Sequence, residues 1–135
     1  MTYARILYHE PMTRFTFLFC AALAVAAALV TPVRAAGPEI TGVEVERDGM
    51  GWRFHVTVLH PDTGWDHYAD GWEVLDADGA VLAKRKLHHP HVNEQPFTRS
   101  LGNVMLPDGT REVWLRAHCS VANWVGEAVK VSVPY

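Results

Sequence analysis

The chain has 135 residues, and with neutral histidines its net charge is −3, from 12 basic and 15 acidic residues. Its length suits a single domain with one hydrophobic core. The longest basic cluster, Lys84-Arg85-Lys86, is too short to follow a phosphate backbone, so the composition argues against a nucleic-acid partner.

The N-terminal segment has the organisation of a signal peptide. Sixteen uncharged residues, 15–30, follow Arg14 and lead to a small-residue cleavage site with Val33 and Ala35 at positions −3 and −1. The run is short and Ala-rich for a membrane span, which needs about 20 apolar residues. We therefore expect residues 1–35 to be a cleaved signal peptide, with residues 1–11 a misassigned start or an extended basic region. Phe19 precedes Cys20 where lipidation needs a small residue, which argues against a lipid anchor there.

Cleavage after Ala35 has consequences for charge and for disulfide bonding. Residues 36–135 carry nine basic and fourteen acidic residues, a net charge of −5. Their only cysteine is Cys119, so no internal disulfide is expected although the compartment, periplasmic or extracellular, is oxidising. No stable membrane anchor is expected after cleavage.

Short segments of alternating polarity follow Gly37-Pro38, separated by turn signals every 8 to 12 residues, and no long segment has a helical period. The segment 40–46 ends at Asp48-Gly49, and 52–59 alternates apolar and polar side chains. The segments 72–76 and 80–86 flank a turn at Gly79, after which 97–104 ends before the turn at Pro107. Two further strands are predicted at 112–119 and 129–133.

Seven such strands, with Trp72 on the third, predict an all-β fold: a single antiparallel sandwich over residues 36–135 of the immunoglobulin or fibronectin type III kind. The absence of a disulfide favours the latter. Because consecutive strands run in opposite directions, the second, fourth and sixth connections, 60–71, 88–96 and 120–127, should share one end. Six histidines lie in these connections or at their borders: His60, His67, His88, His89, His91 and His118.

This concentration of imidazoles predicts a transition-metal site, because neutral imidazole is the commonest protein ligand for such ions. Nitrogen-rich ligation suits copper or zinc, and a thiolate ligand favours Cu(I) or Zn(II). No zinc-finger or HExxH spacing is present. The candidate ligands are His60, His67, His89 and His91, with His118 and Cys119 as additional candidates, and the candidate acceptors that would orient the rings are Asp66, Asp70 and Glu94.

Another interpretation gives the histidines a structural role, in which they form hydrogen bonds to loop backbone and carboxylates. Trp65, Tyr68 and Trp124 would then form a platform for a protein or glycan, in a non-catalytic interaction module. Cys119 shares its strand face with Leu115 and Ala117, so a buried, inert thiol is also an open alternative. No nucleophile has a catalytic context, so we do not expect an enzyme. Under the metal-binding interpretation, a metal-delivery protein or another periplasmic protein is the expected partner.

Two segments also resemble a family of small, uncharacterised secreted proteins from proteobacteria. The first is GWDHYADGWEV and the second HPHVNEQPFTRSL, and the likeness extends from about residue 43 to 127. The matching positions are Gly64, Trp65, His67 to Asp70, Trp72, 89–92 and 94–101. The chain departs from the family at Cys119, where Asp is typical, and at Ala122-Asn123, where His-Gly is typical. The resemblance implies a shared module but supplies no function.

Overall fold

A computed structural model describes residues 37–124 and 126–135 of the chain. The predicted signal peptide and its cleavage site lie outside these described residues. The regular structure of the described residues consists of eight strands, and they include no helix long and apolar enough to cross a membrane. The strands are β1 (Glu39–Asp48), β2 (Gly51–Leu59), β3 (Ala69–Leu75), β4 (Val81–Lys86), β5 (Phe97–Val104), β6 (Glu112–Cys119), β7 (Asn123–Trp124) and β8 (Val129–Ser132).

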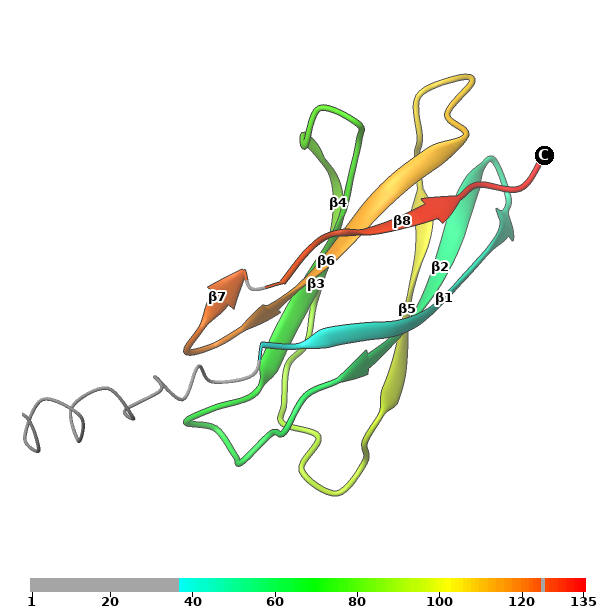
Figure 1. Ribbon diagram of the computed structural model, residues 1–135. Helices are drawn as coiled ribbons and strands as arrows, with labels where there is room; N and C mark the ends of the chain where they lie inside the picture. The colour runs from blue at the N-terminus through cyan, green and yellow to red at the C-terminus, as the bar shows by residue number, and fades with distance from the viewer. Residues whose placement is uncertain (1–36, 125) are drawn as a thin grey trace, which may run out of the picture. The chain divides into compact units, whose positions relative to one another are not determined.

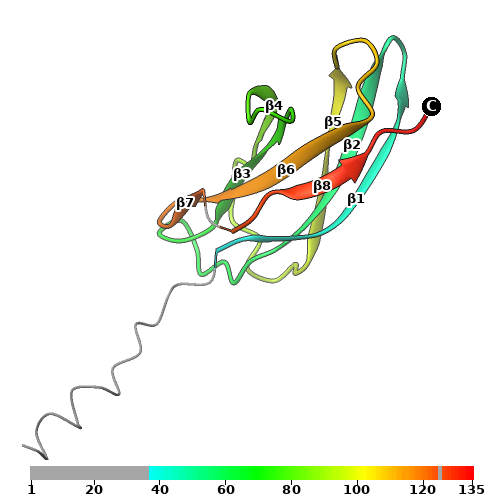
Figure 2. The same ribbon diagram turned by 45° about the horizontal axis from the view of Figure 1, so that its top comes forward.

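The strands form two antiparallel sheets (Figures 1 and 2). One has three strands in the order β1-β2-β5, and the other has five, in which β4-β3-β6 are consecutive and both β7 and β8 pair with β6. The first, second and fifth strands thus face the third, fourth, sixth and last, as in a fibronectin type III sandwich. The predicted fold class is confirmed.

The prediction of seven strands was one short, because the sixth connection contains the two-residue strand β7. Asn123 has a φ of 61°, which turns the chain back so that Cys119 pairs with Asn123 and His118 with Trp124. A strand of two residues is too short to show an alternating pattern, so it could not be predicted from the sequence.

The core lies between the sheets and follows from the alternation of apolar residues. Phe54, Val56 and Val58 of β2 are fully buried, and so are Val113 and Leu115 on the inner face of β6. Each apolar side chain of this size contributes about 1.5–3 kcal/mol when buried. The same alternation continues beyond Val58 and Leu115, so His60 and Cys119 also point inward.

The histidine-bearing connections do share one end of the sandwich, which we call the loop end and define as residues 60–68, 87–96 and 120–122 (Figure 1). Hydrogen bonds link the three segments. The backbone N–H of His91 donates to Asp62 Oδ2 at 2.7 Å, and that of Ser120 donates to the carbonyl of Tyr68 at 3.0 Å. Residues far apart in the sequence are therefore held together here.

Candidate metal centre

Three candidate ligands meet at the loop end: His60, His67 and Cys119. Each offers one ligand atom, and the three atoms lie within 4.8 Å of one another. His60 and Cys119 are fully buried, whereas His67 is partly exposed. Among residues 37–124 and 126–135 this is the one group of three or more such side chains with a geometry that could hold an ion.

Strand parity explains two of these positions. His60 follows Val58 on the inward face of the chain leaving β2, and Cys119 follows Ala117 on the inward face of β6. Because β2 and β6 belong to different sheets, His60 and Cys119 approach the same space from opposite layers.

His67 reaches the group from a short turn. The backbone N–H of His67 donates to the carbonyl of Gly64 at 3.2 Å, and that of Thr63 donates to the carbonyl of His67 at 2.9 Å. Gly64 has a φ of 141°, which other residues rarely adopt. The rings of His60 and His67 then meet edge to face, with centroids 4.8 Å apart.

Asp62, which is not among the three predicted orienting carboxylates, fixes the orientation of His60. Its buried Oδ1 lies 2.6 Å from His60 Nδ1 and also accepts the backbone N–H of Ala69 at 2.9 Å. A carboxylate at Nδ1 favours a proton there and leaves the lone pair of Nε2 free for a metal. Within the described residues, Nε2 of His60 and Nε2 of His67 are buried and have no hydrogen-bond partner.

His89 and His91 lie beside this group rather than in it. The His91 ring stacks on Phe97 with centroids 3.8 Å apart, and its side chain is 2% exposed. His89 is exposed, with its ring centroid 4.5 Å from that of His91. Burial lowers the pKa of His91, and the charges of Arg99 and His89 act in the same direction.

His118 faces away from Cys119, on the outer surface of the five-stranded sheet. Its Nδ1 is hydrogen-bonded to Asp70, and its ring lies 4.6 Å from that of Trp124. The structure therefore places His118 outside the group formed by His60, His67 and Cys119.

The three predicted orienting carboxylates have other environments. Asp66 is exposed, Asp70 binds His118, and Glu94 forms an ion pair with Arg99 at 3.0 Å that lowers the pKa of Glu94. Across the described residues, no hydrogen bond joins any of them to the three clustered ligands. The orienting carboxylate is Asp62, and the two-residue spacing His60-Pro61-Asp62 was the signal in the sequence.

The predicted aromatic platform is divided between two places. Trp65, which is 67% exposed, contacts Tyr68 edge to face at 5.8 Å in the connection between β2 and β3. Trp124 instead lies against His118.

Comparison with known proteins gives one informative relative. A protein from Halomicrobium mukohataei described as a "Putative lipoprotein" is 38% identical over 96 residues, which cover 69% of this chain and 47% of that protein. The chain thus spans about half the length of this relative. No protein-family model matches the chain, and no solved structure matches it.

Proposed function

We propose that the chain is an extracytoplasmic protein that binds a copper or zinc ion between His60, His67 and Cys119. The observation that carries the proposal is the convergence of three ligand atoms within 4.8 Å. Around an ion with bonds of about 2.0–2.1 Å to nitrogen and about 2.3 Å to sulfur, ligand atoms lie about 3.3–3.8 Å apart. Small rotations of the side chains would close the difference.

Two unpartnered nitrogens in the cluster are available to an ion. A buried polar atom without a hydrogen bond costs about 1–3 kcal/mol. His60 Nε2 and His67 Nε2 are two such atoms among the described residues, and both belong to the cluster. An ion would use both lone pairs. Both ring nitrogens of His91, which stacks on Phe97 outside the cluster, are also buried without a hydrogen-bond partner in the described part of the chain, so the support comes from the convergence of the two Nε2 atoms with Cys119.

The proposed location rests on the N-terminal segment and on the relative. Residues 15–30 have the length and flanks of a signal peptide. The relative's description names a lipoprotein, a class of exported protein. A buried thiolate site outside the cytoplasm would meet copper and zinc ions directly, and a role in metal handling follows.

Metal titration tests the proposal. The purified protein, stripped with a chelator, should bind one equivalent of Cu(I) or Zn(II) with a Kd below about 1 µM, equivalent to about −8.2 kcal/mol. Cys119→Ser and His60→Gln should each weaken binding, since each removes one of three ligands. Binding no tighter than micromolar for Cu(I), Cu(II) and Zn(II) would refute metal binding as the function.

His55→Gln is the matched control. His55 lies in the middle of β2 on the outer face, where its ring nitrogens contact Ser100 at 2.7 Å and Glu46 at 2.9 Å. It is a histidine like His60, which follows the end of β2, but within the described residues it has no hydrogen bond to the cluster. Its substitution should leave the metal affinity unchanged.

The second candidate function is non-catalytic binding of a protein or glycan. It is supported by the exposed Trp65, which packs on Tyr68 close to His67 in sequence. Large exposed aromatic side chains often anchor partners. If this surface receives a metal-delivery protein, Trp65→Ala should slow metal transfer from that protein while leaving the Kd for free metal unchanged.

A further inference from the structure

A groove on the outer face of the five-stranded sheet has the features of a second binding site. We propose that it binds a small ligand that carries an anionic group beside a flat ring face, such as an acidic sugar or an aromatic carboxylate. This inference is independent of the metal proposal, because it concerns the other face of β6.

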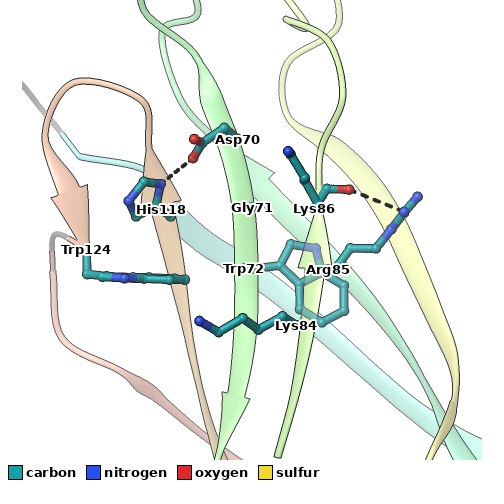
Figure 3. A pocket seen from close by; sticks show the side chains of 8 residues that line it. All are labelled: Asp70, Gly71, Trp72, Lys84, Arg85, Lys86, His118 and Trp124. Atoms are coloured by element: carbon teal, nitrogen blue, oxygen red, sulfur yellow. Dashed lines mark hydrogen bonds and ion pairs between the residues drawn. The ribbon is translucent and has the colours of Figure 1, made fainter. Parts of the chain in front are cut away.

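The strand register explains why a groove forms. Trp124, His118, Gly71 and Lys86 are consecutive cross-strand neighbours on β7, β6, β3 and β4, so they form one row on the outer face. Gly71 leaves a gap in the middle of this row. The resulting cavity has a volume of about 230 Å³ and is lined by residues that include these four, Asp70 and Lys84 (Figure 3).

Gly71 is required by the backbone as well. A Cβ at this position would lie 2.9 Å from the carbonyl oxygen of Arg85 on β4, closer than real Cβ contacts. A glycine within a strand often marks a place where a ligand or another backbone approaches closely, and here the neighbour is the backbone of β4. Gly71 therefore allows β4 to pack closely against β3, and its missing side chain leaves the cavity between Trp124 on one side and Lys84 and Lys86 on the other.

The aromatic wall is Trp124, which is 37% exposed. Its ring is held by His118 at 4.6 Å and by the Arg116 guanidinium at 4.8 Å, and His118 is in turn held by Asp70. A large flat ring fixed from several sides is a preorganised surface for stacking a sugar or another ring.

The charges around the groove favour an anion. Glu73, which is fully buried and follows the lining residues Gly71 and Trp72 on β3, forms ion pairs with Arg116 at 2.5 Å and with Lys84 at 3.3 Å, and Asp70 is bound to His118. Lys86 has no ion-pair partner among the described residues. Its ammonium group is therefore available for an ion pair with a ligand carboxylate, although the net charge of the domain is negative.

The size of the groove limits the ligand. Sites for drug-sized molecules have volumes of about 300–1,000 Å³, so about 230 Å³ suits a single ring. One ring against Trp124 would lie beside the Lys84 ammonium group, whose Nζ is 5.7 Å from the centre of the Trp124 ring, with Lys86 on the far side of Gly71 (Figure 3).

Binding of matched acidic and neutral ligands tests the proposal. The protein, expressed as the full chain and purified, is titrated by calorimetry with galacturonate against galactose, and with 4-hydroxybenzoate against 4-hydroxybenzyl alcohol. We expect one acid to bind at least about tenfold more tightly than its neutral match. The pair that shows the difference identifies the source, sugar or aromatic. The proposal is overturned if neither acid binds with a Kd below about 10 mM, or if the neutral match binds as tightly.

Substitutions assign the binding to the groove. Trp124→Ala should abolish binding and Trp124→Phe should restore part of it, while Lys86→Gln should weaken binding of the acid alone. Lys130→Gln, on β8 and paired with Glu112, is the matched control and should change nothing. If Trp124→Ala does not fold, Lys86→Gln tests the proposal instead, because Lys86 is exposed and its substitution should leave the fold intact. An unchanged affinity in Lys86→Gln contradicts the proposal.

Discussion

Asp62 connects three parts of the loop end through one carboxylate. It contacts His60 Nδ1 and accepts the backbone N–H groups of Ala69 and His91. Its side chain is fully buried. A buried carboxylate with three hydrogen-bonded contacts supports both the fold of the loops and the orientation of a metal ligand.

Asp62→Asn tests both roles. The amide loses the negative charge and cannot accept at both positions, so we expect a loss of about 1.5–3 kcal/mol in the free energy of unfolding. Metal affinity should fall by about 10–100-fold, as for other residues that orient a ligand. Urea denaturation and metal titration measure the two effects. Asp66→Asn, exposed in the same connection, should leave both values unchanged.

His91 should make stability depend on pH. Because burial lowers its pKa in the folded state, the unfolded chain binds the proton more readily, and stability rises with pH. The contribution of His91 to stability is complete above the ordinary histidine pKa of about 6.5. It declines as the pH falls below that value toward the lower pKa of His91 in the folded state. Urea midpoints of the metal-free protein between about pH 7.5 and 5.5 measure this decline.

His91→Gln should make that decline shallower, and His55→Gln should not. An equally steep decline in His91→Gln would assign the pH dependence to other groups.

At the scale of strands, the inward face of β2 and β6 was predictable, whereas the turn between β2 and β3 was not. Alternation through Val56, Val58 and His60, and through Ala117 and Cys119, already points these side chains inward. The position of His67 depends on the hydrogen bonds around Gly64, and such turn geometry has no periodic signature. The sequence thus indicated six metal-ligand candidates at one end, and the structure brings three of them together.

Gly71→Ala tests how closely β3 and β4 pair. The added methyl group would meet the Arg85 carbonyl oxygen at 2.9 Å, so the two strands must move apart. We expect a loss of about 1–3 kcal/mol in the free energy of unfolding, typical of overpacking. Thermal denaturation measures the loss. Gly42→Ala, where the nearest atom is Thr57 Oγ1 at 3.5 Å, should cost clearly less.

For the whole molecule, bound metal should raise the stability of the fold. An ion that binds only the folded state contributes about 2.7 kcal/mol at a concentration 100 times its Kd. For a domain of this size, about 1 kcal/mol shifts Tm by roughly 4–8 °C. We therefore expect Tm to rise by about 10–20 °C with saturating metal in the parent protein, and much less in Cys119→Ser. A Tm that does not respond to metal would argue that the ligands do not bind an ion together.

His60 and Cys119 approach each other from the two strands that a conserved disulfide joins in antibody domains, the second and the sixth. With one cysteine among residues 36–135, that covalent bond cannot form within the domain. An ion held by the two side chains would act as a removable cross-link between the layers. Hydrogen bonds from His91 and Ser120 already hold the segments of the loop end together, so the ion would add a further link between the layers and make this end more rigid with metal bound than without it.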